Sequence, residues 1–331
     1  MDLRILSRAD VERLLPMDAC IELMARALEA TARGGAVLPL RSAVPVPDRR
    51  GVIAVMPGYL DEPRGFGLKI VSVFPGNHGT ALDSHQGAVM LFDPDTGSPL
   101  AVIDASSVTA IRTAAVSGVA TRALARDDAA DLAILGSGVQ AATHLAAMLC
   151  VRPGIAAGRV RVWSRDPEHA RRFAEVQGRR HGLAIEVAAG PRAAIEGATL
   201  ICTTTAASQP ILEGAWVLPG AHINAVGACV ATARELDTAA VARARLVVDR
   251  RESALAEAGD FLIARREGAV GDDHIAGELG DVLLGRIAGR RSPAEVTLFE
   301  SLGIAVEDLA AARYLLDRAI ATDAGVVVPF V

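Results

Sequence analysis

A glycine-rich turn between a buried strand and a helix is the strongest constraint on the fold of this 331-residue chain. The apolar run Leu132–Leu135 is typical of a buried strand, and residues 140–149 have helical character. Between them lies a G-x-G-x-x-A sequence, in which glycines permit a tight turn and close approach of a pyrophosphate. The helix N-terminus supplies free N–H donors for phosphates. The turn therefore predicts a dinucleotide site, the alternative being a purely structural turn. Its expected cofactor contacts are Gly136, Ser137, Gly138, Val139 and Gln140.

Strands and helices alternate from Asp131 onward, which predicts a Rossmann-type, doubly wound parallel sheet. After the strand at 132–135, we expect strands at 160–163, 185–187, 200–204, 222–226 and 246–248, with helices near 167–180 and at 191–196.

The first hundred residues have a different pattern, typical of a smaller α+β domain. Residues 8–32 are predicted to form one amphipathic helix. Short apolar runs between turn signals then indicate antiparallel strands, followed by an Ala-rich helix at 109–125. A final helix at 306–321 is expected to pack back on this domain. The predicted strands lie at 52–56, 67–74, 89–92 and 100–103.

Composition excludes several classes of protein. The net charge of −5 gives no advantage in the phosphate field of nucleic acid, so no nucleic-acid role is expected. No apolar run reaches membrane-spanning length, and the first residues lack the form of a signal peptide. The four cysteines form no CxxC pair, which favours reduced thiols in the cytoplasm and no metal site.

The end of the second Rossmann strand indicates which nicotinamide cofactor is used. An acidic residue there would bind the ribose 2′-hydroxyl of NAD. This chain has Ser164 and Arg165 instead, and an arginine can bind a 2′-phosphate. We therefore expect NADP(H), with NAD(H) possible. In the alternative interpretation Arg165 is solvated and Asp166 contacts the ribose.

Three cations are candidates for binding a substrate carboxylate. Lys69 interrupts an apolar strand, where it either faces solvent at an edge or is partly desolvated and able to transfer a proton near neutral pH. Arg41 and Arg112 would each suit an exposed surface. Together with Lys69, however, they could form a cationic pocket for a small carboxylate.

Several segments of the chain match a known family. They are Lys69–Val73, Ser84–Gly87, Leu91–Pro94, Thr109–Ala115, Leu135–Ala141, Pro219–Gly227, Arg234–Asp237 and Ser301–Asp308. On these segments the chain resembles the ornithine cyclodeaminase/mu-crystallin family over nearly its whole length.

The resemblance implies a homodimer that uses NAD(P) on small amino or imino acids. It implies a substrate-binding and dimerisation domain at 1–115 with 305–331, and a Rossmann domain at 116–304. Arg41, Lys69 and Arg112 match the positions that bind the carboxylate and handle the proton.

One departure from the family pattern is informative. The cyclodeaminases carry a catalytic Asp two residues after Asn224–Gly227, where this chain has Cys229. A thiol cannot replace that carboxylate in cyclodeamination, whereas simple imine reduction does not need it. We therefore expect an imine (ketimine) reductase that acts on a small α-imino acid such as pyrroline-2-carboxylate, piperideine-2-carboxylate or iminosuccinate and gives an L-amino acid. The alternatives are an ornithine or lysine cyclodeaminase, an alanine or opine-type dehydrogenase, and a non-catalytic NADPH-dependent carrier.

The expected site combines both domains. Lys69 and Arg112 are the predicted catalytic residues, and Arg41, His85 and Met56 are further substrate contacts. Beyond the glycine turn, the expected cofactor contacts are Ser84, Thr113, Ser164, Arg165, Thr203, Thr204, Thr205, Val226, Gly227 and Ser301.

Overall fold

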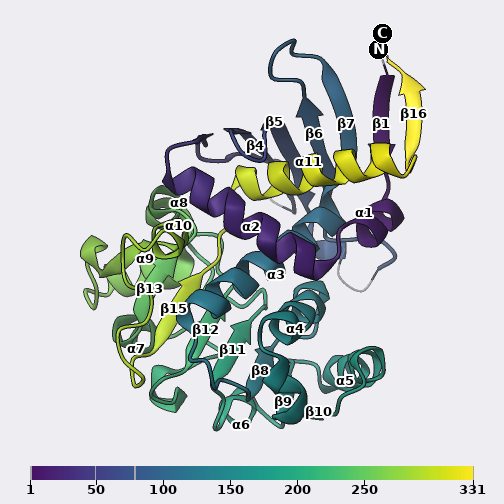
Figure 1. The fold of residues 1–331 in the computed structure, drawn as a ribbon. Coiled ribbons are helices and arrows are strands. Elements are labelled where there is room, and N and C mark those ends of the chain that lie inside the picture. The colour runs from purple at the N-terminus through teal and green to yellow at the C-terminus, as the bar shows by residue number, and fades with distance from the viewer. Residues whose placement is uncertain (1, 49, 78–79, 331) are drawn as a thin grey trace. The chain divides into compact units, whose positions relative to one another are not determined.

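The computed structural model describes residues 2–48, 50–77 and 80–330. The chain divides into two compact units, one formed by Met1–Arg112 with Gly303–Val331 and the other by Thr113–Leu302. The boundaries expected from the sequence were 115/116 and 304/305. The first division falls inside helix α3 (Ala105–Leu124) (Figure 1).

The first unit is a mixed sheet with helices on one face. The strand order is β16-β1-β7-β6-β5-β4-β2, and β3 also pairs with β4. All of its pairs are antiparallel except β1 with β7. The elements are β1 (Asp2–Leu6), α1 (Arg8–Leu14), α2 (Met17–Ala32), β2 (Ala36–Val37), β3 (Ser42–Pro45), β4 (Val52–Leu60), β5 (Gly65–Val73), β6 (His85–Phe92), β7 (Pro99–Asp104), α11 (Ala305–Ala321) and β16 (Val326–Pro329).

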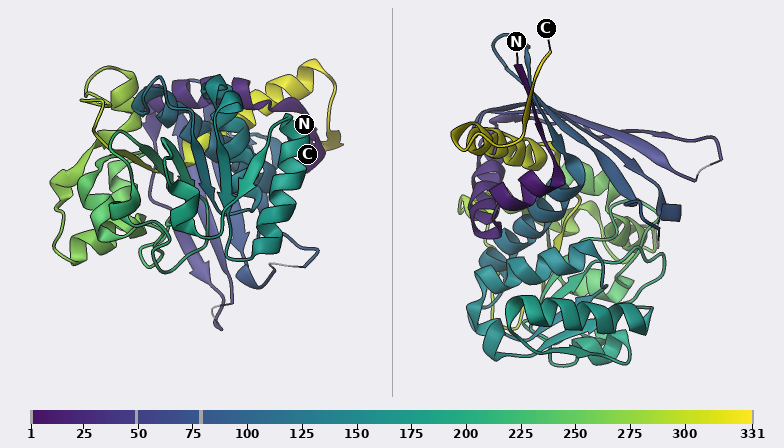
Figure 2. Two further views of the ribbon diagram at one scale, coloured as in Figure 1. Left: turned by 90° about the horizontal axis from the view of Figure 1, so that it is seen from below. Right: turned by 90° about the vertical axis from the view of Figure 1, so that its right-hand side faces the viewer.

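Helix α11 packs directly on the central strands. It contacts β4, β5 and β6 and also lies against α2. A Cβ at Gly58 or Gly67 would lie 3.3 Å or 3.2 Å from the Leu309 side chain of this helix, which is tighter than ordinary van der Waals contact, so the glycines let α11 approach the sheet closely. In the right-hand view of Figure 2, the yellow α11 and the purple α2 lie on the same side of the strands.

The single helix expected at 8–32 is wrong, because the structure has two helices there. Helix α1 ends at Leu14 and α2 begins at Met17. Pro16 lies between them, where it has no N–H to donate and disfavours helical backbone at the residue before it.

The second unit is built on an all-parallel sheet of order β10-β9-β8-β11-β12-β15-β13-β14, as the fold class predicted. The chain starts at β8, moves outward to β10 and then crosses back to β11, so the switch point lies between β8 and β11. Besides α3, the elements are β8 (Leu132–Leu135), α4 (Val139–Val151), β9 (Val160–Trp163), α5 (Pro167–His181), β10 (Ile185–Val187), α6 (Pro191–Ile195), β11 (Leu200–Thr203), β12 (His222–Ala225), α7 (Thr238–Arg243), β13 (Arg245–Val248), α8 (Arg251–Glu257), α9 (Gly259–Arg266), β14 (Ile275–Glu278), α10 (Leu279–Leu283) and β15 (Thr297–Glu300).

Candidate functional site

Lys69 is buried in the first unit. It lies in β5 on the face that carries α11, and only 3% of its surface is exposed. Its Nζ lies 2.7 Å from Asp308 Oδ2 of α11 and 3.5 Å from Thr109 Oγ1 of α3. Of the two interpretations of Lys69, the structure therefore agrees with the desolvated lysine and not with the lysine that faces solvent.

Arg112 shares the carboxylate of Asp308 with Lys69. Its Nε lies 3.0 Å from Asp308 Oδ1, and its Nη1 lies 2.6 Å from Glu307 Oε2. The guanidinium also packs against Gly303, where an added Cβ would come within 2.6 Å of Nη1. Gly303 has φ of +77°, a backbone conformation that favours glycine. Glycine is thus favoured here both by the backbone and by the closeness of the Arg112 side chain.

Arg41 lies near the same group of charges. It follows β2, and its Nη2 donates to the carbonyl oxygen of Gly303 at 3.4 Å. With both carboxyls ionised, the three cations and the two acids of α11 carry a formal charge of +1. This balance suits a ligand that brings one carboxylate.

The surroundings of Lys69 determine its proton affinity. Burial lowers the pKa of Lys69 to about 8, and the nearby charges of Arg112 and Arg41 also lower it, whereas Asp308 opposes them. Burial would raise the pKa of Asp308, but Arg112 and Lys69 outweigh that effect and hold it below the usual value. Lys69 can therefore donate or accept a proton close to neutral pH.

The other two expected substrate contacts lie in different places. Met56 is buried and directly opposite Lys69 in the β4–β5 pairing. His85 begins β6 at the register partner of Val73, is exposed, and has its Nδ1 3.0 Å from Ser84 Oγ. The structure thus brings Arg41, Lys69, Arg112 and Met56 together. His85 and Ser84 lie instead at the end of the β5–β6 pair where β5 ends at Val73.

Glu307 and Asp308 belong to this charge cluster, although neither was expected from the sequence. Both are fully buried, although they stand next to each other in α11. Two adjacent acids within the apolar sequence Ile304–Ala312 were the available signal.

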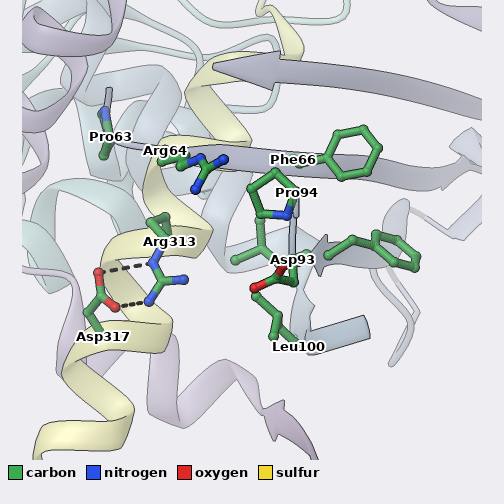
Figure 3. Close-up of a pocket in the computed structure, with 11 residues that line it drawn as sticks. Pro63, Arg64, Phe66, Asp93, Pro94, Leu100, Arg313 and Asp317 are labelled. Atoms are coloured by element: carbon green, nitrogen blue, oxygen red, sulfur yellow. Dashed lines mark hydrogen bonds and ion pairs between the residues drawn. The ribbon is translucent and has the colours of Figure 1, made fainter. Parts of the chain in front are cut away.

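A surface pocket of about 320 Å³ in the first unit is separate from this charge cluster. Figure 3 shows it beside α11, where Arg313 and Asp317 of that helix are paired. Its other arginine, Arg64, is paired with Asp95 at 2.7 Å. Both arginines are thus already neutralised by carboxylates, so the pocket is a poor receptor for a substrate anion.

The glycine turn of the second unit has the geometry needed by a dinucleotide. Gly136 has φ of +120°, and a Cβ there would come within 2.6 Å of Thr204 Oγ1. Gly138 is the N-cap of α4 without a side-chain capping bond, and a Cβ added there meets open space. The first N–H groups of α4 are therefore available to phosphate oxygens, and the residues fit a pyrophosphate.

The remaining expected cofactor residues lie at several places along this sheet. Ser164 and Arg165 follow β9, where Arg165 is exposed. Asp166 is the N-cap of α5 and accepts a bond from Glu168 N at 2.9 Å. Thr113 and Ser301 are buried. Thr203, Thr205 and Gly227 all donate hydrogen bonds to the carboxylate of Glu235, another residue that the sequence argument did not single out.

Comparison with known proteins identifies the family. The model of the ornithine cyclodeaminase/mu-crystallin family matches residues 1–323. The chain belongs to this family. A relative named ketimine reductase mu-crystallin, from Mus musculus, is 44% identical over 285 residues, which cover 86% of this chain and 86% of the relative.

Solved structures of family relatives share the whole fold. The Δ1-pyrroline-2-carboxylate reductase of Thermococcus litoralis, in complex with NADH and L-proline, matches with a TM-score of 0.94 and 38% identity, over 98% of this chain and 99% of that one. An archaeal alanine dehydrogenase dimer with bound NAD matches with a TM-score of 0.92 and 30% identity over both full chains.

Across 2–48, 50–77 and 80–330, no three His, Cys, Asp or Glu residues are grouped so that they could hold a metal ion. No helix in that part of the chain is both long and apolar enough to cross a membrane.

Proposed function

We propose that this chain is an NAD(P)H-dependent reductase that converts a small α-imino acid into an L-amino acid. The observation that carries the proposal is the buried group of Lys69, Arg112 and Asp308, in which a lysine with a pKa of about 8 lies beside an arginine. The family relatives support the same class of reaction, since two of them are named as reductases of a ketimine and of pyrroline-2-carboxylate.

Arg41 and Arg112 would hold the substrate carboxylate, because guanidinium groups bind carboxylates bidentately. Lys69 Nζ would donate its proton to the imine nitrogen, which makes the α-carbon electrophilic. A bound reduced nicotinamide supplies the hydride that this carbon accepts. The carbon–nitrogen double bond then becomes a single bond with one proton from Lys69 and one hydride. Asp308 stays ionised between its two cationic partners and keeps Lys69 oriented.

The test is cofactor oxidation followed with a panel of substrates. The panel contains pyrroline-2-carboxylate, piperideine-2-carboxylate, iminosuccinate, and pyruvate with ammonia or methylamine. We expect turnover with at least one preformed α-imino acid. Release of ammonia from ornithine with NAD⁺ alone, and no turnover with any imine, would assign the chain to the cyclodeaminases instead.

We also propose a preference for NADPH over NADH, which rests on Ser164 and Arg165. The alternative ribose contact, Asp166, already caps α5 through Glu168 N. Replacing Arg165 by alanine should raise the KM for NADPH about tenfold and leave the KM for NADH nearly unchanged, because one charge-assisted bond to the 2′-phosphate is lost. Arg172→Ala, an exposed arginine on α5, is the matched control. A wild-type preference for NADH would refute the assignment.

We further propose that the chain forms a homodimer through the sheet face opposite α11. Most side chains on that face are apolar and partly exposed, with Ile53 45% and Phe66 41% exposed. A monomeric protein rarely exposes an apolar patch of this kind. The occupant proposed here is a second copy of the chain, in line with the dimer of the archaeal alanine dehydrogenase. The apolar side chains of this face include Ile53, Val55, Phe66, Leu68, Ile70, Met90, Phe92 and Val102.

Light scattering after size-exclusion chromatography measures the assembly. The wild-type protein should have twice the 34.3 kDa mass of one chain. The double variant Ile53→Asp, Phe66→Asp should elute as a monomer, since two carboxylates from each copy would be buried in the contact. Val176→Asp, at an exposed position of α5, should remain a dimer. A monomeric wild-type protein at micromolar concentration would contradict the proposal.

A further inference from the structure

The carboxylate of Glu235 joins two loops at the end of the parallel sheet. Oε2 accepts hydrogen bonds from Thr203 Oγ1 at 2.8 Å and from Gly227 N at 2.7 Å. Oε1 accepts from Thr205 N and Thr205 Oγ1, both at 2.6 Å. The residue is fully buried. One side chain therefore holds the segments that follow β11 and β12.

These two segments lie at the edge of the sheet where ligands bind in this fold class. Thr203 is the last residue of β11, and Gly227 lies two positions after the end of β12. Ligands of open parallel sheets bind outside the carboxyl ends of the strands, next to the switch point. Here that switch point is the β8–β11 pair, so the loop after β11 adjoins it.

The two loops are also packed tightly against each other. A Cβ at Gly227 would come within 1.9 Å of the carbonyl oxygen of Thr205 and within 2.7 Å of the Glu235 carboxyl. The contact leaves no room for a side chain at position 227, so the two loops can meet around the Glu235 carboxylate only because this residue is glycine.

A second carboxylate fixes the backbone of Glu235 itself. Asp260 Oδ1 accepts hydrogen bonds from Glu235 N at 2.8 Å and from Leu236 N at 2.9 Å. Glu235 thus has its backbone held from α9 and both carboxyl oxygens engaged by donors. A group enclosed in this way can shape its neighbours but has no capacity left to react with a ligand.

We propose that Glu235 is a positioning residue for the cofactor, which holds the loops after β11 and β12 in the shape that receives the nicotinamide half of NAD(P)H. The inference rests on the proposed use of NAD(P)H. It goes beyond that proposal because Glu235 would shape the cofactor site through the two loops, without binding phosphate or ribose itself.

The isosteric variant Glu235→Gln is a sharp test because each carboxyl oxygen accepts from a backbone N–H. In either orientation the glutamine NH₂ must face Thr205 N–H or Gly227 N–H, and one of these donors loses its acceptor. We expect the Kd for NADPH, measured by cofactor fluorescence, to rise about tenfold. The stabilisation of the folded protein by saturating NADPH in thermal unfolding should shrink in parallel. Glu213→Gln, at an exposed position of the same unit, is the control and should bind NADPH like wild type.

A second pair of variants covers the case in which Glu235→Gln fails to fold. Thr203→Val removes one hydroxyl donor to Oε2 from a fully buried side chain, whereas Thr203→Ser keeps it. Binding of NADPH should weaken about threefold in the valine variant and return in the serine variant.

A merely structural role would lower the unfolding temperature of Glu235→Gln without changing the Kd of the folded protein, and that result would overturn the inference. Failure of the wild-type chain to bind NADPH or NADH would overturn it too. Because binding is read without turnover, failure to reduce any imine would contradict the proposed reaction while leaving the role of Glu235 intact.

Discussion

Lys69→Arg should lower the rate of imine reduction about 100-fold or more, although it keeps a positive charge at this position. A positioned proton donor contributes about 100- to 10,000-fold to a rate, and arginine cannot donate a proton at neutral pH. Lys69 is the only lysine in the sequence, and every other basic residue apart from histidine is an arginine. Burial lowers the pKa of this one lysine to about 8, a value that no arginine side chain reaches.

Steady-state kinetics and cofactor binding measure this effect separately. The Kd for NADPH should stay within about twofold of wild type, because no cofactor contact is assigned to Lys69. Lys69→Met, which removes the charge and nearly preserves the volume, should lose at least as much activity. Unfolding curves of both variants confirm that the folded protein is being assayed. Wild-type turnover in Lys69→Arg would show that a fixed cation is sufficient, and the proton-donor role would then be wrong.

Some of these features were predictable because their signals are local. The turn at Gly136 follows an apolar run directly, and Lys69 stands out within an apolar strand of its own. Both observations need only a few consecutive residues. The Rossmann topology was likewise accessible from the alternation of strands and helices, since parallel strands require crossover connections.

Other features were not predictable because they depend on distant partners. Strand β15 lies inside the sheet between β12 and β13, yet it begins with Thr297 and ends with Glu300 and has no clear strand pattern. Strand β1 pairs with β16, so Asp2 lies opposite Pro329 from the other end of the sequence. Such strands are defined by their neighbours rather than by their own composition.

The acidic half of the site was missed for the same reason. Asp308 and Arg112 are 196 residues apart, and an acid in an amphipathic helix is usually solvent-exposed. The structure shows the opposite, because α11 places Glu307 and Asp308 against β5 and α3. Cations in an apolar strand or helix imply buried counter-charges, but the sequence alone does not say which acids supply them.

Asp308→Asn should destabilise the fold and move the pH profile at the same time. Asp308 is fully buried between Lys69 Nζ at 2.7 Å and Arg112 Nε at 3.0 Å. Removing one partner of a buried ion pair costs about 3–5 kcal/mol, because the remaining charges stay desolvated. Asp317→Asn on the same helix breaks an exposed pair with Arg313 and should cost about 1 kcal/mol or less. Denaturant unfolding of the two variants measures the difference.

The pH profile gives the sign of the electrostatic coupling. In the proposed mechanism Lys69 donates the proton, so the wild-type rate should fall as the pH rises through about 8. Asp308 raises the pKa of Lys69, and its loss must lower that pKa, so the fall in rate should move to lower pH in Asp308→Asn. Because the sequence has one lysine, ¹⁵N-lysine labelling gives a single side-chain signal whose titration reports this pKa without any assay. An unchanged Lys69 pKa in Asp308→Asn would contradict the ion pair as the source of the coupling. An unchanged rate profile with a shifted pKa would instead separate Lys69 from the proton-transfer step.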